Sequence, residues 1–101
     1  MSNHTNKSNS IHLTKKILFK YLNHIDCQIF LFGSQVNDTS RKPMDIDIAI
    51  MPLQTFPMGL FSEIREAVEE STIPYPVDII DLSLADLQFV EHVKKTGIQW
   101  K

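Results

Sequence analysis

The segment 45–51 constrains the fold of this chain more than any other part of its sequence. These residues are DIDIAIM, so isoleucine alternates with aspartate and alanine. Successive side chains of a β-strand leave opposite faces, and the three isoleucines therefore share one face while Asp45 and Asp47 share the other. We expect a strand whose isoleucine face is buried against a core and whose opposite face carries two carboxylates.

Two further short apolar segments predict strands that accompany this one. They are residues 27–32, CQIFLF, and residues 76–82, PVDIIDL, both rich in β-branched or aromatic residues. In residues 11–25 and 59–71, apolar residues recur at three- and four-residue steps, which predicts two amphipathic helices.

A last helix is predicted from its ends. Ser83 and Asp86 have the spacing of a capping box, which would open a helix over residues 84–97. Gly97 is suited to close this helix as its C′ residue. The resulting order of helices and strands predicts an α/β fold in which helices pack on a small sheet.

The chain is expected to form one domain. Its 101 residues are enough for a single hydrophobic core but not for two. Residues 1–10, MSNHTNKSNS, are poor in apolar side chains, and we expect them to form a disordered tail because burial cannot offset the entropy of ordering them. Residues 11–101 are then the folded domain.

Composition narrows the classes of function. The net charge is -2 and basic residues occur in runs no longer than pairs, which disfavours long nucleic acid as a substrate. The single cysteine, Cys27, excludes an intrachain disulfide and a cysteine-rich zinc site. No apolar stretch approaches the ~18 residues of a membrane span, so no membrane is expected as a partner and a reducing cytoplasm is the simplest compartment.

Asp45 and Asp47 are candidates for metal binding. A rise of about 3.3 Å per residue puts their backbone positions roughly 6.6 Å apart on one face, from which their carboxylates can converge on a shared ion. Two magnesium ions in phosphoryl-transfer sites lie about 3.5–4 Å apart, which suits this spacing. The alternative is a solvated sheet face, but aspartate is depleted in strands and two in one short strand favour a function.

A third carboxylate lies in the segment 76–82. Asp78 is inside an apolar strand, where an aspartate has to find a cation or hydrogen-bond donors, or be protonated. Asp81 precedes a predicted helix start and has a simpler role as a cap or a solvated residue. Of these two carboxylates, Asp78 is therefore the better candidate for a function.

Gly33 and Ser34 complete a motif with the first two carboxylates. Glycine at a strand end allows a close backbone approach to a ligand, and free N–H groups at such a turn bind phosphate oxygens. The pattern from Gly33 to Asp47 is G-S-x10-D-x-D, with Gly-Ser ending one predicted strand and Asp-x-Asp opening the next. This pattern, in residues 31–50, together with residues 76–100, resembles the minimal nucleotidyltransferases of the DNA polymerase beta superfamily.

The resemblance implies a fold and a set of roles. The fold would be a polymerase-beta-like nucleotidyltransferase fold, a small mixed β-sheet packed with helices. Asp45 and Asp47 would hold two Mg²⁺ ions, Asp78 would help to position the ion that activates the attacking group, and Gly33 and Ser34 would cradle the triphosphate.

The resemblance also implies an activity and a partner. Members of this kind transfer a nucleoside monophosphate, here AMP from ATP, to an acceptor hydroxyl. Small members resemble the antitoxin half of two-gene systems, which adenylylates a helical HEPN-domain toxin. Two alternatives stay open: an interaction module that masks its partner by binding, and the nucleotide-binding subunit of a two-chain transferase for a small molecule.

One departure from the family pattern concerns the charge of the phosphates. Many members have a basic residue directly after Gly-Ser, where this chain has Gln35. The phosphate charge would then be met by Arg41 or Lys42 in the same segment, unless these two are simply solvated. The departure bears on affinity for the triphosphate and not on the metal site.

Overall fold

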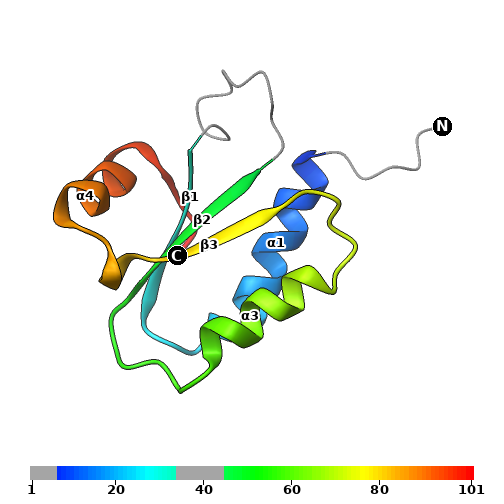
Figure 1. Cartoon of the computed structure of the whole chain (residues 1–101), viewed down its shortest axis with the longest axis horizontal. Helices are drawn as coiled ribbons and strands as arrows, with labels where there is room; N and C mark the ends of the chain where they lie inside the picture. The colour runs from blue at the N-terminus through cyan, green and yellow to red at the C-terminus, as the bar shows by residue number, and fades with distance from the viewer. Residues whose placement is uncertain (1–6, 34–44) are drawn as a thin grey trace.

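The computed structural model describes residues 7–33 and 45–101, and the centre of the fold is a four-stranded sheet (Figure 1). The strands are β1 (Cys27–Phe32), β2 (Ile46–Pro52), β3 (Val77–Asp81) and β4 (Ile98–Gln99). Their order is β3-β2-β1-β4, with β2 parallel to β3 and with β1 antiparallel to both β2 and β4. The sheet is therefore mixed, as predicted.

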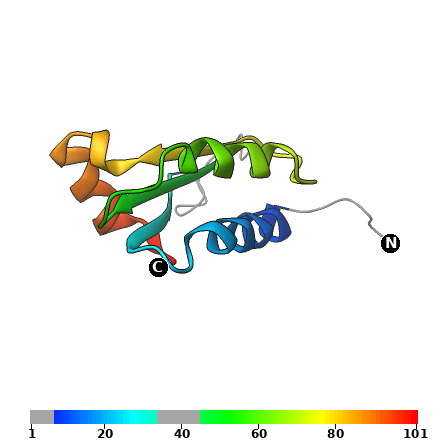
Figure 2. The ribbon, with the colours of Figure 1, turned by 90° about the horizontal axis from the view of Figure 1, so that it is seen from below.

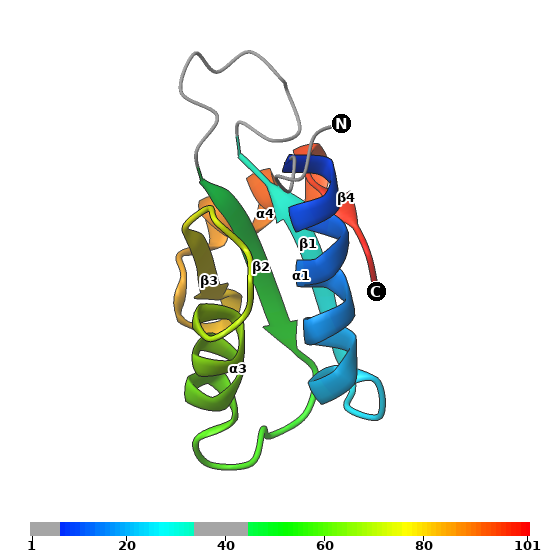
Figure 3. The same cartoon turned by 90° about the vertical axis from the view of Figure 1, so that its right-hand side faces the viewer.

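Helices cover both faces of this sheet. Helices α1 (Lys7–Leu22) and α3 (Leu60–Glu69) pack on one face, and α4 (Leu87–Thr96) packs on the other (Figures 2 and 3). A short 3-10 helix, η1 (Leu82–Leu84), joins β3 to the segment before α4. None of the helices in the described ranges is long and apolar enough to cross a membrane.

The alternation of segment 45–51 determines which face of β2 packs on α1 and α3 and which face packs on α4. Ile46, Ile48 and Ile50 are 0% exposed and pack in the core formed with α1 and α3. Ala49, on the opposite face, is buried in the smaller core beneath α4. The alternation prediction is confirmed, and both faces of β2 are covered along its middle.

Helix α1 begins at Lys7, four residues earlier than predicted, so the expected tail is wrong for residues 7–10. Ser10 and Thr14 are fully buried, and the Thr14 hydroxyl donates to the Ser10 carbonyl oxygen at 2.8 Å. The Lys7 ammonium lies 5.3 Å from the centre of the Tyr75 ring. Tertiary packing thus stabilises a polar turn whose composition alone predicts no order. Residues 1–6 lie outside the described ranges.

The predicted capping box before the last helix is wrong. Asp86, and not Ser83, is the N-cap of α4, and its carboxylate accepts a hydrogen bond from the Phe89 N–H at 2.8 Å. Ser83 lies inside η1, where its N–H and its hydroxyl both donate to the Asp81 carboxylate. Gly97 closes α4 as its C-cap with an extended backbone. A Cβ there would lie 2.7 Å from the Val93 carbonyl oxygen, which explains the glycine.

Candidate active site

Strand pairing brings two of the predicted site residues side by side. In the parallel pairing of β2 with β3, Asp47 lies opposite Asp78, and in the antiparallel pairing of β1 with β2 it lies opposite Phe32. Because β1 ends where β2 and β3 begin, Gly33 follows Phe32 at this same edge of the sheet (Figure 1). The edge therefore gathers Gly33, Asp45, Asp47 and Asp78, which are all the predicted site residues that lie in the described ranges.

Gly33 packs against the Asp47 carboxylate. A Cβ added at Gly33 would lie 2.6 Å from the Asp47 Oδ2 atom, closer than real contacts allow. Gly33 also has a φ of 84°, in the left-handed region that disfavours other residues. Glycine is thus required here on two grounds, and one of them is the position of the Asp47 side chain.

The Asp47 carboxyl is influenced by the charges of Asp45, Asp78 and Lys7. The side chain of Asp47 is partly buried, and this burial raises the pKa of its carboxyl, with further increases from the charges of Asp78 and then Asp45. The charge of Lys7 acts in the opposite direction on the pKa of Asp47. Asp45 and Asp78 are both exposed. Burial and the two neighbouring carboxylates thus both disfavour the ionised form of Asp47.

The three carboxylates fit magnesium by their chemistry. Carboxylate oxygens are the hard donors that this ion prefers, and a cation would relieve the repulsion that raises the pKa of Asp47. In the described part of the chain, however, no three His, Cys, Asp or Glu side chains are close enough to form a ready-made metal cluster. Asp45 and Asp78 are exposed side chains, so they have the freedom to converge on an ion held by Asp47.

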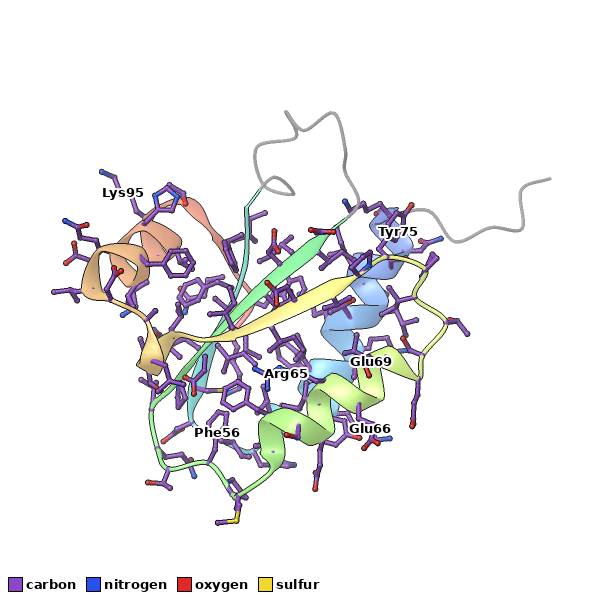
Figure 4. All side chains as sticks on the ribbon, in the orientation of Figure 1. Phe56, Arg65, Glu66, Glu69, Tyr75 and Lys95 are labelled. Carbon is purple, nitrogen blue, oxygen red and sulfur yellow. The ribbon has the colours of Figure 1, made fainter. Side chains whose placement is uncertain are left out.

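Lys7 and Tyr75 are neighbours of this edge that the sequence did not point to. The Ile46 N–H donates to the Pro76 carbonyl oxygen at 2.9 Å, which fixes Tyr75 next to the start of β2. Figure 4 shows Tyr75 beside the first turn of α1. Burial lowers the pKa of Lys7, and the charges of Asp45 and Asp47 act to raise this pKa. Lys7 was assigned to a tail by its polar surroundings, and no local signal could have placed it here.

Other predicted residues do not belong to the described site. Ser34, Gln35, Arg41 and Lys42 lie outside the described residues, so their predicted roles stay predictions. Asp81 is the cap of η1, as its simpler interpretation predicted.

A surface hollow of about 650 Å³ lies far from the carboxylates. The loop after β2 lines most of it, with Asp81 and Ser83 on the other side. Because β2 runs from Ile46 to Pro52, this hollow is at the opposite end of the strand from Asp47. It is not part of the candidate site.

Comparison with known proteins agrees with this geometry. Residues 9–99 match the family described as polymerase beta, nucleotidyltransferase. The probable protein adenylyltransferase MntA of Haemophilus influenzae is 29% identical over 92 residues, which cover 91% of this chain and 79% of that protein. A chain in a crystal structure of a toxin–antitoxin with AMP-PNP is 28% identical and has a TM-score of 0.66, covering 93% of this chain and 72% of that chain.

A second solved structure is a tri-AMPylated Shewanella oneidensis HEPN toxin in complex with MNT antitoxin. A chain in it is 26% identical to this one and has a TM-score of 0.58, covering 87% of this chain and 69% of that chain. The family match spans all four described strands, and it includes Gly33, Asp45, Asp47 and Asp78. This chain therefore belongs to the polymerase beta nucleotidyltransferase family.

Proposed function

We propose that this chain transfers AMP from ATP to a hydroxyl group of a HEPN-domain partner protein. The observation that carries this proposal is the position of Asp47 among the other site residues. Its side chain packs on Gly33, it lies opposite Asp78 in the neighbouring strand, and burial, followed by the charges of Asp78 and Asp45, raises the pKa of its carboxyl. Relatives supply the substrate and the partner: one is named a protein adenylyltransferase, and another structure contains an AMPylated HEPN toxin.

The reaction brings the acceptor hydroxyl and the α-phosphate of ATP together at the end of the sheet that carries Asp45, Asp47 and Asp78. This end of the sheet is called the carboxylate edge below. The acceptor hydroxyl oxygen forms a bond to the α-phosphorus of ATP, the bond between the α-phosphorus and the bridging oxygen to the β-phosphate breaks, and pyrophosphate leaves. The hydroxyl proton is released to solvent. A productive pose puts the hydroxyl oxygen roughly 3–3.5 Å from the α-phosphorus, so the partner must contact the edge near Gly33, Asp45 and Asp78.

Each residue of the site has a separate task in this reaction. Asp45 and Asp47 would hold two magnesium ions, and Asp78 would hold the one nearer the acceptor. When bound, such ions supply charge stabilisation for both the attacking and the leaving oxygen. Gly33 leaves its backbone open to close approach because it lacks a side chain, and with Ser34 it would cradle the phosphates.

The experiment uses the product of the neighbouring gene as the acceptor. The chain, that product, ATP and magnesium are mixed, and the acceptor is weighed by mass spectrometry. We expect the acceptor to gain the mass of one or more AMP groups, and Asp45→Ala to abolish this gain. Asp26→Asn is the matched control, because Asp26 is exposed in the turn before β1 and far from the site.

The outcomes separate this proposal from its two alternatives. An acceptor that is bound and inhibited but not modified would favour the masking module. An acceptor that is neither bound nor modified would favour a small molecule as the substrate. Modification that persists in Asp45→Ala would contradict the role of the carboxylates.

A further inference from the structure

Bound ATP brings negative charge to an edge that already carries three carboxylates. A triphosphate with magnesium is stabilised by positively charged groups as well as by the ions, and such groups are part of phosphoryl-transfer sites in general. Gln35 supplies no charge after Gly-Ser. Arg41 and Lys42 lie outside the described residues, so the described part of the fold is where a further basic residue near this edge can be sought.

Three basic side chains of the described residues are held elsewhere by contacts of their own. Arg65, a residue of α3, donates to the Ile79 carbonyl oxygen of β3 and lies over the ring of Phe61 in its own helix (Figure 4). Lys15 lies over the Trp100 ring, and Lys101 donates to the Ile25 carbonyl oxygen. These contacts lie along α1, α3 and the chain end, away from the carboxylate edge.

Lys7 is placed differently, because two successive contacts bring its ammonium near that edge. The Ile46 N–H donates to the Pro76 carbonyl oxygen, which puts Pro76, the residue after Tyr75, beside the start of β2. The Tyr75 ring then lies under the Lys7 ammonium, with 5.3 Å between Nζ and the ring centre. Of the described basic residues, Lys7 is the one whose charge acts on the Asp47 carboxyl.

We propose that Lys7 is a nucleotide-positioning residue, whose ammonium offsets Asp45 and Asp47 in the metal-free chain and binds the phosphates of ATP when these carboxylates hold divalent ions. The first turn of α1 and the Tyr75 ring hold the ammonium at the edge in both states. Lys7 thus provides from α1 the charge that Gln35 does not provide. This inference rests on the proposed function, because it requires ATP as the ligand.

The proposal predicts two effects of opposite sign in one variant. Lys7→Met removes a charge that competes with magnesium for the carboxylates, so magnesium alone should bind at least about twofold more tightly. The same variant loses a charge-assisted contact to phosphate, so Mg-ATP should bind about tenfold more weakly. Damage to the fold would weaken both, and so it cannot produce this split.

The experiment measures binding by isothermal titration calorimetry, with magnesium chloride alone and then with Mg-ATP. Lys16→Met is the matched control, because Lys16 is an exposed lysine of the same helix. Lys7→Arg keeps the charge and should retain Mg-ATP affinity within about threefold. Tyr75→Leu tests the ring independently, and it should also weaken Mg-ATP binding while leaving magnesium binding unweakened.

Three results would overturn the inference. Unchanged Mg-ATP binding in Lys7→Met shows that Lys7 does not position the nucleotide. Weaker binding of both ligands, in Lys7→Met and in Lys7→Arg alike, shows that Lys7 only supports the fold. If the wild-type chain binds magnesium but not Mg-ATP, the proposed function itself fails and the inference fails with it.

Discussion

The two ends of the β2–β3 pair carry aspartates in opposite situations. At the end where the strands begin, Asp47 and Asp78 lie opposite each other, and within residues 7–33 and 45–101 neither carboxylate accepts a hydrogen bond. Past the other end, Asp81 accepts from the N–H and the hydroxyl of Ser83, and Asp86 accepts from the Phe89 N–H. Among the described residues, the same residue type therefore has protein donors at one end of the strand pair and none at the other.

This difference separates aspartates that bind a ligand from aspartates that shape the chain. A cap carboxylate stabilises the fold because it pairs with orphan N–H groups of a helix. Carboxylates that repel each other without donors destabilise the fold, and they are retained where a ligand uses them. Substitutions at the two ends should therefore change different quantities, and this expectation leads to the tests below.

Asp47→Asn should have the largest effect of any single change, and it should act on activity. The amide keeps the size and shape of the side chain but removes a charge that holds cations. Transfer of AMP should fall by a factor of about one hundred or more, while the metal-free fold should be at least as stable as the wild type. Rates are measured with the acceptor protein, and stability is measured by urea unfolding.

Asp81→Asn is the matched control at the other end of the strand pair. It changes the same chemical group, lies far from the site, and keeps a cap at η1, because asparagine caps helices about as well as aspartate. Activity should stay within about twofold, and stability should stay within about 0.5 kcal/mol of the wild type. Equal losses of activity in Asp47→Asn and Asp81→Asn would remove the distinction between the two ends.

Ligands that bind where β2 and β3 begin should raise the stability of the folded chain, and this increase should depend on Asp47. Mg-ATP at 100 times its dissociation constant should add about 2.7 kcal/mol to the free energy of unfolding. Magnesium alone should add less, and Asp47→Asn should lose both increases. Thermal melting with and without the ligands measures this, and a chain that melts at one temperature under all conditions would exclude a nucleotide site.

Gly33→Ala tests whether the position of Asp47 depends on Gly33. The new Cβ would meet Asp47 Oδ2, and we expect activity to fall about tenfold as the carboxylate is displaced, a change of about 1.4 kcal/mol. Gly59→Ala is the matched control, because Gly59 has a φ of 83° but nothing within 4 Å of its added Cβ. Both variants should lose about 1 kcal/mol of stability from backbone strain. Similar activity in the two variants would count against the contact.

Strands β1, β2 and β3 and helix α3 were the parts of the fold that the sequence predicted best. The alternation in segment 45–51 depends only on side chains leaving opposite faces, so it indicated which face of β2 is buried. The start of α1 could not be predicted, because Ser10 and Thr14 are polar and are buried only by tertiary packing. The cap of α4 was misplaced by three residues, because Ser83 fits the capping pattern but is used inside η1.

The site was predictable where its residues are close in sequence or belong to the family motif. Asp45, Asp47 and Gly33 belong to one motif, and the motif and the strand pattern together pointed to Asp78. The parallel pairing that puts Asp78 opposite Asp47 was not derivable from spacing, because sheet order is decided by the whole chain. Lys7 is contributed by a helix far from the motif in sequence, and only the fold brings it there.

Asp86→Ala should have a smaller effect, limited to stability. The Phe89 N–H would lose its partner at the start of α4, which should cost about 1 kcal/mol of unfolding free energy. Activity at a temperature below melting should not change, because α4 carries none of the proposed site residues. Asp86→Asn should recover most of the loss, since asparagine also caps helices. A loss of activity without a loss of stability would extend the site to α4.

The smallest expected effect is the pH dependence of the metal-free chain. Burial, then Asp78 and Asp45, raise the pKa of Asp47 above the value of about 3.9 that an unfolded aspartate has. The folded chain therefore holds its proton more tightly than the unfolded chain, and ionised Asp47 destabilises the fold. Well below the unfolded pKa both states are protonated and there is no penalty. The penalty grows as pH rises through that value, and it is complete above the folded pKa.

Asp47→Asn isolates this contribution, because an amide does not titrate in this range. The variant should be as stable as the wild type near pH 3, apart from a constant offset, and relatively more stable at pH 7. Urea unfolding of both proteins across this range, without divalent metal, measures the difference. A pH-independent difference between wild type and Asp47→Asn would mean that neither burial nor the neighbouring carboxylates disfavour ionised Asp47, and the contrast between the two ends would then rest on hydrogen bonding alone.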